Sequence, residues 1–302
     1  MPSMRSQPGI LAPLAAFGRS LSFRLKPLGD PSAALALSRL QAGFDPDWGV
    51  AGLGEPLLRA VGASLSGIRT FPSFSGHGCS VPSTQQAVWI FLGAESRSLT
   101  FDRSREVQAL LDETCELVDE QDTFQYQGGR DLTGFEDGTD NPDAEESVAV
   151  AFVDRGPLAG SSFVAVQRWK HDLACFFAHP GSARDAMIGR RRADNAEIDD
   201  APASAHVKRS AQESFDPEAF LVRRSMPWVC AGEQGLEFIG YGRSFDAFEQ
   251  ILRRMAGLED GIVDALFNFS QPVTGGYYWC PPLADGRLDF RALSLAHERD
   301  DL

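Results

Sequence analysis

The order of the predicted strands and helices constrains the fold of this chain most. Residues 20–26 alternate apolar and polar side chains as a half-buried strand does, and a helical pattern follows that ends near Gly43. The remaining elements of the first half are strands at residues 50–53, 87–92 and 122–126, with a second helix from Ser104 before the last of them. This β-α-β-β-α-β order is that of a ferredoxin-like unit, in which two helices cover one face of an antiparallel sheet.

The second half repeats the same order. The pattern predicts strands at residues 163–169, 220–225, 236–241 and 277–280 and helices at residues 183–189 and 244–255. We therefore expect an α+β protein of two ferredoxin-like halves, residues 1–145 and 146–302, each with an antiparallel sheet. No internal sequence identity supports a duplication, so this expectation rests on the order of the elements alone.

Charge and cysteine usage exclude several classes of partner. The 302 residues carry a formal net charge of −14, which disfavours binding to nucleic acid or to an anionic membrane surface. No apolar run approaches the roughly 18 residues of a membrane span, and the apolar stretch at residues 9–16 is a poor secretion signal. The five cysteines form no Cys-x-x-Cys pair and are typical of free thiols in a reducing compartment. We expect a cytoplasmic protein with small partners, whose sheet edges would allow a homo-oligomer.

The segment from Gly134 to Pro142 has an unusual density of turn-forming residues. It holds three acids, two glycines and an Asn-Pro step within nine positions. Gly134 and Gly138 bracket Asp137 and allow the backbone to approach a flat partner closely. An ordinary capped surface turn is the alternative interpretation, and the segment alone does not decide between the two.

A second notable segment is the predicted strand at residues 220–225. Period-two alternation places Leu221, Arg223 and Ser225 on one face and Val222 and Arg224 on the other. An arginine and a hydroxyl would then share one wall. The alternative is a solvated edge strand, where charged residues are common.

Three segments together resemble the signature of the dye-decolourising peroxidases. They are residues 134–142, Ser204-Ala205-His206 and residues 222–227, with supporting matches at residues 7–11, 238–241 and 272–276. The resemblance covers nearly the whole chain in the same order. It implies two ferredoxin-like halves and a pocket for haem b that is built mainly by the C-terminal half. It also implies reduction of hydrogen peroxide and oxidation of small aromatic, dye-like donors through a high-valent iron-oxo intermediate.

The resemblance also assigns roles to single residues. His206 would be the axial ligand of the haem iron, and Asp137 would relay the proton that peroxide must move before its O–O bond breaks. Arg223 would stabilise the departing oxygen and help to keep Asp137 ionised.

Four further positions receive smaller roles. Ser225 would order a water molecule beside Asp137, and Gly138 and Thr139 would lie against the porphyrin edge. Arg190 would neutralise a haem propionate, since guanidinium groups suit carboxylates.

One position departs from the expected family pattern. The family commonly has an aspartate that accepts the N–H of the axial histidine, and the matching site in this sequence is Asn268. An amide orients the ring without giving it imidazolate character, so a higher reduction potential is expected than in relatives with the acid.

Two alternatives to a peroxidase stay open from the sequence. The chain could be a haem carrier or sensor without significant turnover, or an assembly protein with a lapsed site. A separate question concerns five aromatic residues that could relay electrons from bulky donors, although core packing explains aromatic residues equally well. They are Trp169, Trp228, Tyr277, Tyr278 and Trp279.

Overall fold

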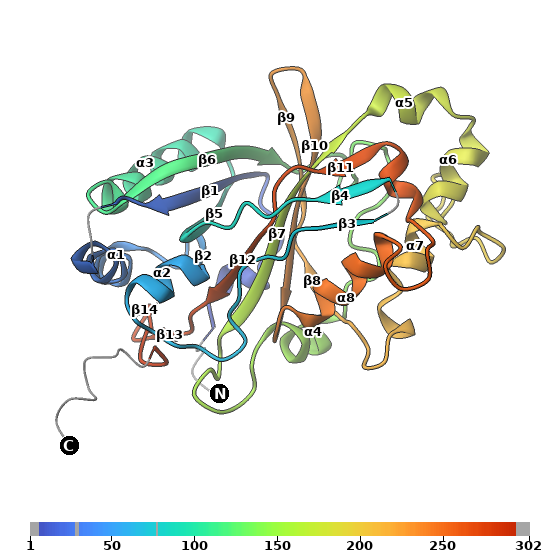
Figure 1. The fold of residues 1–302 in the computed structure, drawn as a ribbon. Coiled ribbons are helices and arrows are strands. Elements are labelled where there is room, and N and C mark those ends of the chain that lie inside the picture. Colours follow the sequence, from blue (N-terminus) through green and yellow to red (C-terminus); the bar gives the residue numbers. More distant parts are fainter. Residues whose placement is uncertain (1–5, 28–29, 77, 294–302) are drawn as a thin grey trace.

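The computed structural model describes residues 6–27, 30–76 and 78–293 (Figure 1). After a short 3-10 turn at Pro8–Ile10, the first half contains β1 (Phe17–Leu25), α1 (Asp30–Gly43), β2 (Gly49–Leu53), α2 (Glu55–Ala60), β3 (Phe74–Gly76), β4 (Cys79–Val81), β5 (Val88–Ala94), α3 (Arg97–Leu111) and β6 (Cys115–Phe124). The four long strands pair antiparallel in the order β6-β1-β5-β2. Numbered along the chain, this order is 4-1-3-2, so the predicted ferredoxin-like unit is confirmed.

The second helix of this half begins earlier than the sequence pattern indicates. Ser96, not Ser104, precedes the first turn of α3, and its hydroxyl accepts a hydrogen bond from the Leu99 amide. Ser104 lies buried within the helix, and its hydroxyl donates to the carbonyl of Phe101. The shift brings β6 forward to Cys115, well before the predicted strand at residues 122–126.

The second half contains α4 (Ala144–Ala151), β7 (Ser162–His171), α5 (Leu173–Ala178), α6 (Gly181–Ile188), α7 (His206–Arg209), β8 (Val222–Arg223), β9 (Met226–Cys230), β10 (Glu233–Gly242), α8 (Asp246–Met255), β11 (Ser270–Pro272), β12 (Gly276–Cys280), β13 (Leu283–Ala284) and β14 (Arg287–Leu288), with 3-10 turns at Gln212–Ser214 and Ala265–Asn268. Its sheet order is β12-β7-β10-β8, again 4-1-3-2. The two halves are therefore topologically equivalent. The boundary expected between residues 145 and 146 falls inside α4, so that division of the chain stays a proposal.

The two sheets join edge to edge into one continuous sheet. The junction is a single bridge between β2 and β12, in which Leu53 is opposite Trp279. A second contact joins the halves away from this bridge, because Arg168 on β7 donates to Asp119 on β6, the other edge strand of the N-terminal sheet, at 2.7 and 2.8 Å. Arg168 also donates to the buried Glu237 on β10 at 3.0 Å. The halves thus share both backbone pairing and a charged network.

The first crossover differs between the halves. In the N-terminal half it is the single helix α1, which buries Ala36, Leu37 and Leu40 against the sheet. In the C-terminal half it runs from residue 172 to residue 221 and contains α5, α6 and α7, and α6 has no buried residue. One face of the C-terminal sheet therefore lacks the close-packed helix that its counterpart has.

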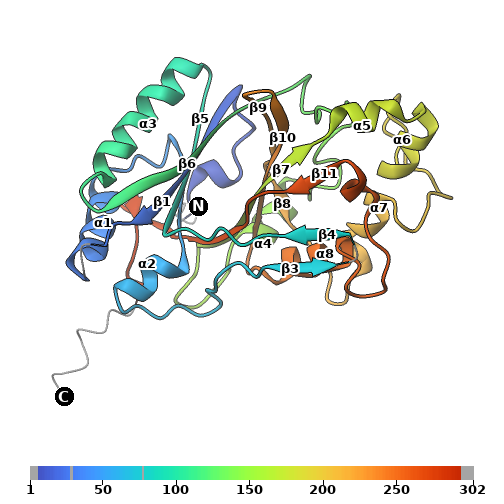
Figure 2. The ribbon, with the colours of Figure 1, turned by 45° about the horizontal axis from the view of Figure 1, so that its top comes forward.

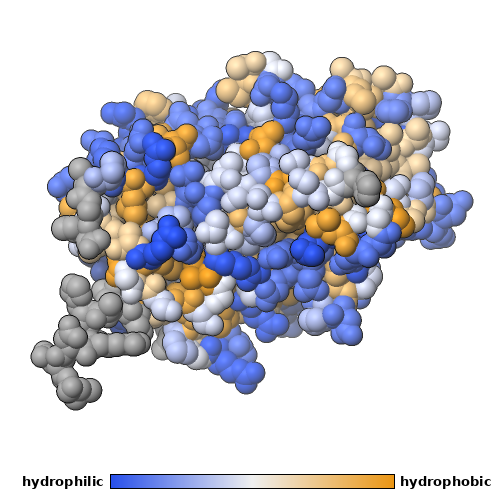
Figure 3. All heavy atoms as spheres, in the orientation of Figure 1, coloured by the Kyte–Doolittle hydropathy of each residue, from blue (hydrophilic) through white to orange (hydrophobic). Residues whose placement is uncertain are grey.

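The β3–β4 hairpin extends from the N-terminal half across to the C-terminal half, where it lies beside β11 in both ribbon views (Figures 1 and 2). Its Cys79 thiol lies 3.8 Å from the carbonyl oxygen of Ala256, just after α8. On the face shown in Figure 3, hydrophilic residues predominate and apolar ones lie in scattered small groups. Within the described ranges, no helix has the length and apolar character that a membrane crossing requires.

Candidate active site

A cavity lies where the C-terminal sheet lacks a close-packed helix. Its walls come from alternate residues of three strands, namely Gln167, Trp169 and His171 of β7, Leu236 and Phe238 of β10, and Leu221 and Arg223 at β8. Period-two geometry explains this spacing, because residues two apart on a strand share one face. The helix α8 closes the opposite side with apolar residues at helical spacing, Phe248, Ile251, Leu252 and Met255. The cavity holds about 1010 Å³ of empty space, its open mouth included, and most of its lining is apolar.

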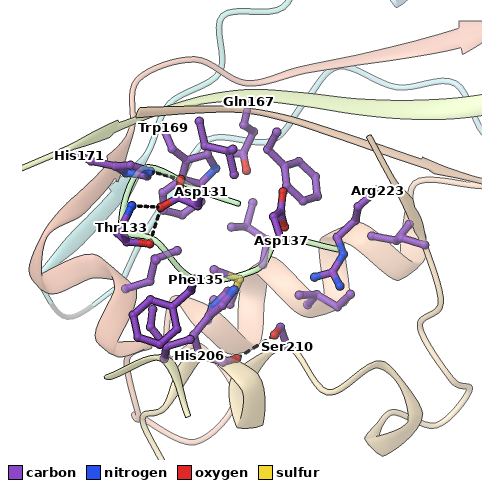
Figure 4. A pocket seen from close by; sticks show the side chains of 18 of the residues that line it. Asp131, Thr133, Phe135, Asp137, Gln167, Trp169, His171, His206, Ser210 and Arg223 are labelled. Atoms are coloured by element: carbon purple, nitrogen blue, oxygen red, sulfur yellow. Dashed lines mark hydrogen bonds and ion pairs between the residues drawn. The ribbon is translucent and has the colours of Figure 1, made fainter. Parts of the chain in front are cut away.

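His206 enters this cavity from the first residue of α7. Its carbonyl accepts hydrogen bonds from both the amide and the hydroxyl of Ser210, which fixes the turn (Figure 4). Its Nδ1 lies 2.7 Å from Oδ2 of the fully buried Asp264, and in the described part of the chain Nε2 has no hydrogen-bond partner. Burial lowers the pKa of His206, but the charge and hydrogen bond of Asp264 outweigh it, so the pKa is raised.

The partner of His206 is a correction to the sequence analysis, which assigned it to Asn268. Asn268 ends the 3-10 turn at Ala265–Asn268, and its side chain is exposed. Asp264 precedes that turn, and its second oxygen accepts the Leu266 amide, so the carboxylate is fixed beside the imidazole. The chain therefore has the acid, four residues earlier than expected, and the prediction of a raised reduction potential loses its basis.

Asp137 reaches the same cavity from the loop between β6 and α4. Its Oδ1 accepts the amide of Gly138, whose φ of +73° suits glycine. Burial raises the pKa of Asp137, the positive charge of Arg223 opposes this, and the negative charge of Asp131 adds to it, so the net shift is upward. Arg223 thus favours the ionised carboxylate as expected, but burial outweighs it.

Arg223 projects from β8 on the side of the cavity where Asp137 lies (Figure 4). The side chain of Asn141 fixes its backbone, because the Asn141 oxygen accepts the Arg223 amide at 2.7 Å and its nitrogen donates to the Arg223 carbonyl at 3.1 Å. The Nε of Arg223 is buried and unpartnered, and its only described ion pair is a 4.0 Å contact with Asp140. Asp137 and Arg223 therefore influence each other without forming a closed ion pair.

Ser225 does not line the cavity that contains His206. The strand β8 ends at Arg223, and Ser225 lies instead in a smaller adjoining cavity of about 450 Å³, its open mouth included, which Asp137 and Arg223 also line. Its hydroxyl is buried without a partner. The expected alternation is confirmed for Leu221 and Arg223, while Val222 packs in the core on the other face of the sheet.

The remaining predicted positions hold the loop rather than line the cavity. Thr139 accepts a hydrogen bond from Asn195, and Arg190 donates to Asp140 at 2.7 Å and lies 3.3 Å from Glu197. Because Arg190 already has two carboxylate partners, its role beside a propionate stays a prediction. Glu136, the third acid of the loop, also contributes to the cavity lining, but its carboxylate pairs with Arg130 at 2.7 Å. Asp137 is therefore the acid of this loop that lines the cavity without an ion pair to a described residue.

Sequence reasoning missed a buried cluster on the opposite wall. His171, at the end of β7, lies 2.7 Å from the hydroxyl of Ser270 and 3.1 Å from Oδ2 of Asp131. The other oxygen of Asp131 accepts the amide and hydroxyl of Thr133. Burial raises the pKa of Asp131, but His171 and Thr133 lower it more, and the net shift is downward. The sequence signal that could have revealed this cluster is the position of His171, two residues after Trp169 and thus on the same strand face.

The five aromatic residues considered as electron relays are all buried. Trp169 lines the cavity, and its carbonyl accepts the indole N–H of Trp228 at 3.2 Å. Tyr277 stacks on Phe245 with ring centroids 4.1 Å apart, as a core residue does. Packing accounts for these positions, and a relay role stays a prediction.

Comparisons with known proteins agree with this geometry. The family model for the C-terminal part of Dyp-type peroxidases matches residues 128–285. A dye-decolorizing peroxidase of Mycolicibacterium paratuberculosis is 35% identical over 222 residues, which are 71% of this chain and 63% of that relative, so the match spans less than two thirds of its length. A dye-decolorizing protein from V. cholerae has a TM-score of 0.81 at 30% identity, covering 90% of this chain and 96% of its own. A Rhodococcus jostii RHA1 DypB variant in complex with haem has a TM-score of 0.83 at 26% identity, with 90% and 94% covered.

Proposed function

Because the chain belongs to the dye-decolourising peroxidase family, we propose that it is a haem-dependent peroxidase that reduces hydrogen peroxide and oxidises small aromatic donors. The observation that carries this proposal is one cavity lined by His206, Asp137 and Arg223, with the Nε2 of His206 unpartnered. A curated relative is named for the same activity, and a structural neighbour is a haem complex.

The residues of the cavity fit a haem group. A flat apolar macrocycle suits the largely apolar walls that β10 and α8 provide. His206 presents the nitrogen that binds iron, and the Asp264 carboxylate fixes its tautomer by holding the proton on Nδ1. The buried Arg223 Nε lacks a partner, as expected of a group that awaits a ligand atom. We take the cofactor to be haem b, with His206 as its protein ligand.

Bound haem would supply the redox chemistry, the two-electron reduction of peroxide and the one-electron oxidation of donors. The protein's own part is proton movement and charge stabilisation. The Asp137 carboxylate takes the proton from one peroxide oxygen and returns it to the other, which leaves as water. A carboxyl whose pKa is raised by burial is suited to both steps, because it takes up and releases a proton with small changes in surroundings.

Arg223 holds a permanent charge where negative charge develops on the leaving oxygen. Since Asn141 clamps its backbone from both sides, the guanidinium is positioned before substrate arrives. Ser225 lies beyond this pair in the adjoining cavity, and its unpartnered hydroxyl would order a water molecule there. The same adjoining cavity would admit peroxide to Asp137.

The rest of the proposal concerns the cellular compartment, self-association and the alternative function. The five cysteines are all free thiols, which supports the cytoplasm as the compartment. The open edges of a continuous sheet leave self-association as an expectation. The alternative of a haem carrier or sensor is less favoured, because transport needs neither a buried carboxylate nor a clamped arginine beside it.

Reconstitution with haemin tests the proposal. We expect a Soret band that shifts in His206→Ala, and turnover of peroxide with a phenol that falls at least a hundredfold in Asp137→Asn while haem stays bound. A carrier would bind haem equally well in the wild type and in Asp137→Asn and show no turnover in either. Absence of any Soret band would reject haem binding altogether.

A further inference from the structure

The turn that leads into the loop carrying Asp137 is tied to the C-terminal sheet by a chain of buried polar contacts. Oδ2 of Asp131 lies 3.1 Å from Nε2 of His171 at the end of β7, and Nδ1 of His171 lies 2.7 Å from the hydroxyl of Ser270 on β11. Ser270 and His171 are also opposite each other in the pairing of β7 with β11. The imidazole, which is 4% exposed, is therefore fixed from both sides.

Asp131 also closes the turn with its own backbone. Its amide donates to the carbonyl of Phe135 at 2.9 Å, which brings the two ends of the turn together. Directly outside the turn, the amide of Asp137 donates to the carbonyl of Gly129 at 3.1 Å. The position of Asp137 therefore depends on a turn that Asp131 closes and that His171 attaches to β7.

The other end of the loop is attached to β8, where the side chain of Asn141 exchanges two hydrogen bonds with the backbone of Arg223. Asp137 lies between the two attachments in the sequence. Figure 4 shows its carboxylate between Asp131 on one side and Arg223 on the other. One of these neighbours is an acid and the other a base, so their charges act on the carboxyl of Asp137 in opposite directions.

The order of these contacts is that of an Asp-His-Ser hydrolase triad, but the hydroxyl has no access to a substrate. Ser270 is fully buried and does not belong to the described residues that line the cavity containing His206. Its hydroxyl serves the imidazole instead, because it can donate to a bare Nδ1 or accept from a protonated one. His171 thus keeps a proton on Nε2 for Asp131 whether the ring is neutral or charged.

The carboxylate of Asp131 acts on Asp137 through its charge as well, since both groups line the same cavity. Burial raises the pKa of Asp137, Arg223 on β8 opposes this, Asp131 adds to it, and the charge of His206 on α7 opposes it. Burial also raises the pKa of Asp131, but the contact with His171 outweighs it, so Asp131 is charged while Asp137 titrates. The other acids of the loop are engaged elsewhere, Glu136 with Arg130 and Asp140 with Arg190.

From this arrangement we propose that Asp131 and His171 are positioning residues for the reaction with peroxide. They anchor the turn that delivers Asp137, and they keep a buried negative charge on the side of Asp137 away from Arg223 (Figure 4). This inference rests on the proposed function, because it concerns the carboxylate that takes the proton from peroxide. Without the charge of Asp131, Asp137 ionises at lower pH. Without the anchor, the carboxylate loses its fixed position in the cavity.

Asp131→Asn separates the charge from the anchor. The asparagine oxygen still accepts from Thr133, and its amide nitrogen donates to Nε2 of His171. The imidazole then carries its proton on Nδ1 and donates it to Ser270, so the contacts are kept while the charge is lost. His171→Leu does the reverse, because Asp131 stays and loses its partner. His171→Gln replaces Nε2 by an amide nitrogen and restores the donor.

The charge is tested on the full chain without haemin, so this readout does not depend on turnover. Carbon NMR of protein labelled at aspartate Cγ follows the titration of each carboxyl, and the Asp137 signal is the one lost in Asp137→Asn. We expect this signal to titrate at lower pH in Asp131→Asn than in the wild type, since a like charge is removed.

Asp172→Asn is the matched control. It removes an exposed acid directly after His171, and its oxygen still accepts the amide of Cys175 at the start of α5. We expect the Asp137 signal to titrate as in the wild type, because solvent screens a charge at this position.

Turnover of the haem-reconstituted protein gives the second readout. The value of kcat/KM for peroxide requires ionised Asp137, so it should rise with pH to a plateau. In Asp131→Asn the rise should move to lower pH, which increases kcat/KM about three- to tenfold on the acid side, while Asp172→Asn follows the wild type. In His171→Leu the plateau should fall about tenfold or more, and His171→Gln should recover most of it.

Two results would overturn the role of the charge, an Asp137 signal that titrates alike in Asp131→Asn and the wild type, or an equal shift in Asp172→Asn. The anchor is rejected by an unchanged plateau in His171→Leu. A plateau in His171→Gln more than about tenfold below the wild type also rejects it, whether or not His171→Leu folds. If the wild type turns over no peroxide, the proposed function fails, and the NMR titration still decides whether Asp131 acts on Asp137.

Discussion

Replacing Asp264 by asparagine should weaken haem binding through the tautomer of His206. The Asp264 carboxylate accepts from two donors at once, His206 Nδ1 at 2.7 Å and the Leu266 amide at 2.8 Å. An amide has only one oxygen for these two positions. If the oxygen stays with Leu266, the amide nitrogen donates to Nδ1 and leaves the proton on Nε2, where it blocks metal binding.

If the amide is turned the other way, the tautomer is kept but the Leu266 amide meets another donor. The tautomer that can bind haem therefore leaves the Leu266 amide unsatisfied, which costs about 1–3 kcal/mol. Converted at about 1.4 kcal/mol per factor of ten, the haem dissociation constant should rise roughly 5- to 150-fold. This range overlaps the roughly 10- to 100-fold typical of residues that support a metal ligand.

The assay is a haemin titration followed at the Soret band, together with a measured reduction potential. We expect weaker binding and a raised potential in Asp264→Asn, since the imidazole loses its anionic partner. The control is Asn268→Asp, which adds a carboxylate on an exposed side chain and should change neither quantity. Wild-type affinity and potential in Asp264→Asn, or a shifted potential in Asn268→Asp, would refute the assignment.

Three further predictions concern stability and pH. Asp137→Asn should abolish at least 99% of peroxide turnover yet raise the melting temperature at neutral pH. Burial raises the pKa of Asp137 in the folded protein, so its ionised form destabilises the fold above that pKa. The gain in melting temperature should disappear below pH 4, as scanning calorimetry across pH would show. Arg168→Met should cost about 3–5 kcal/mol in urea unfolding because it leaves Glu237 buried without its partner, and an undiminished midpoint would contradict this. Gly134→Ala should cost about 1–2 kcal/mol for a left-handed alanine that also displaces Arg192, measured by the same unfolding curve, with a neutral result counting against the strain.

The fold was accessible from the sequence because strand alternation and element order are local signals. Both halves have the 4-1-3-2 strand order that β-α-β-β-α-β predicts. The start of α3 was not accessible in the same way, since Ser96 and Ser104 are equally good caps by composition. Burial of Ser104 against the sheet decides between them, and burial is a tertiary property.

The candidate site, like the fold, could be predicted from the sequence only in part. Three short segments far apart in sequence predicted His206, Asp137 and Arg223, and the structure brings them to one cavity. The acid behind His206 was misplaced, because a single 3-10 turn directs Asn268 outward and leaves Asp264 beside the ring. No local pattern shows which way such a turn faces.

The unequal first crossovers make the two halves unequal in how they complete their cores. In the N-terminal half, the helix α1 covers this face of the sheet, so side chains of the chain itself complete the core there. The C-terminal half leaves that face to a cavity, and a cofactor bound there would act as the missing piece of its core. Ligand binding and folding are then linked for one half only, by RT ln(1 + [L]/Kd).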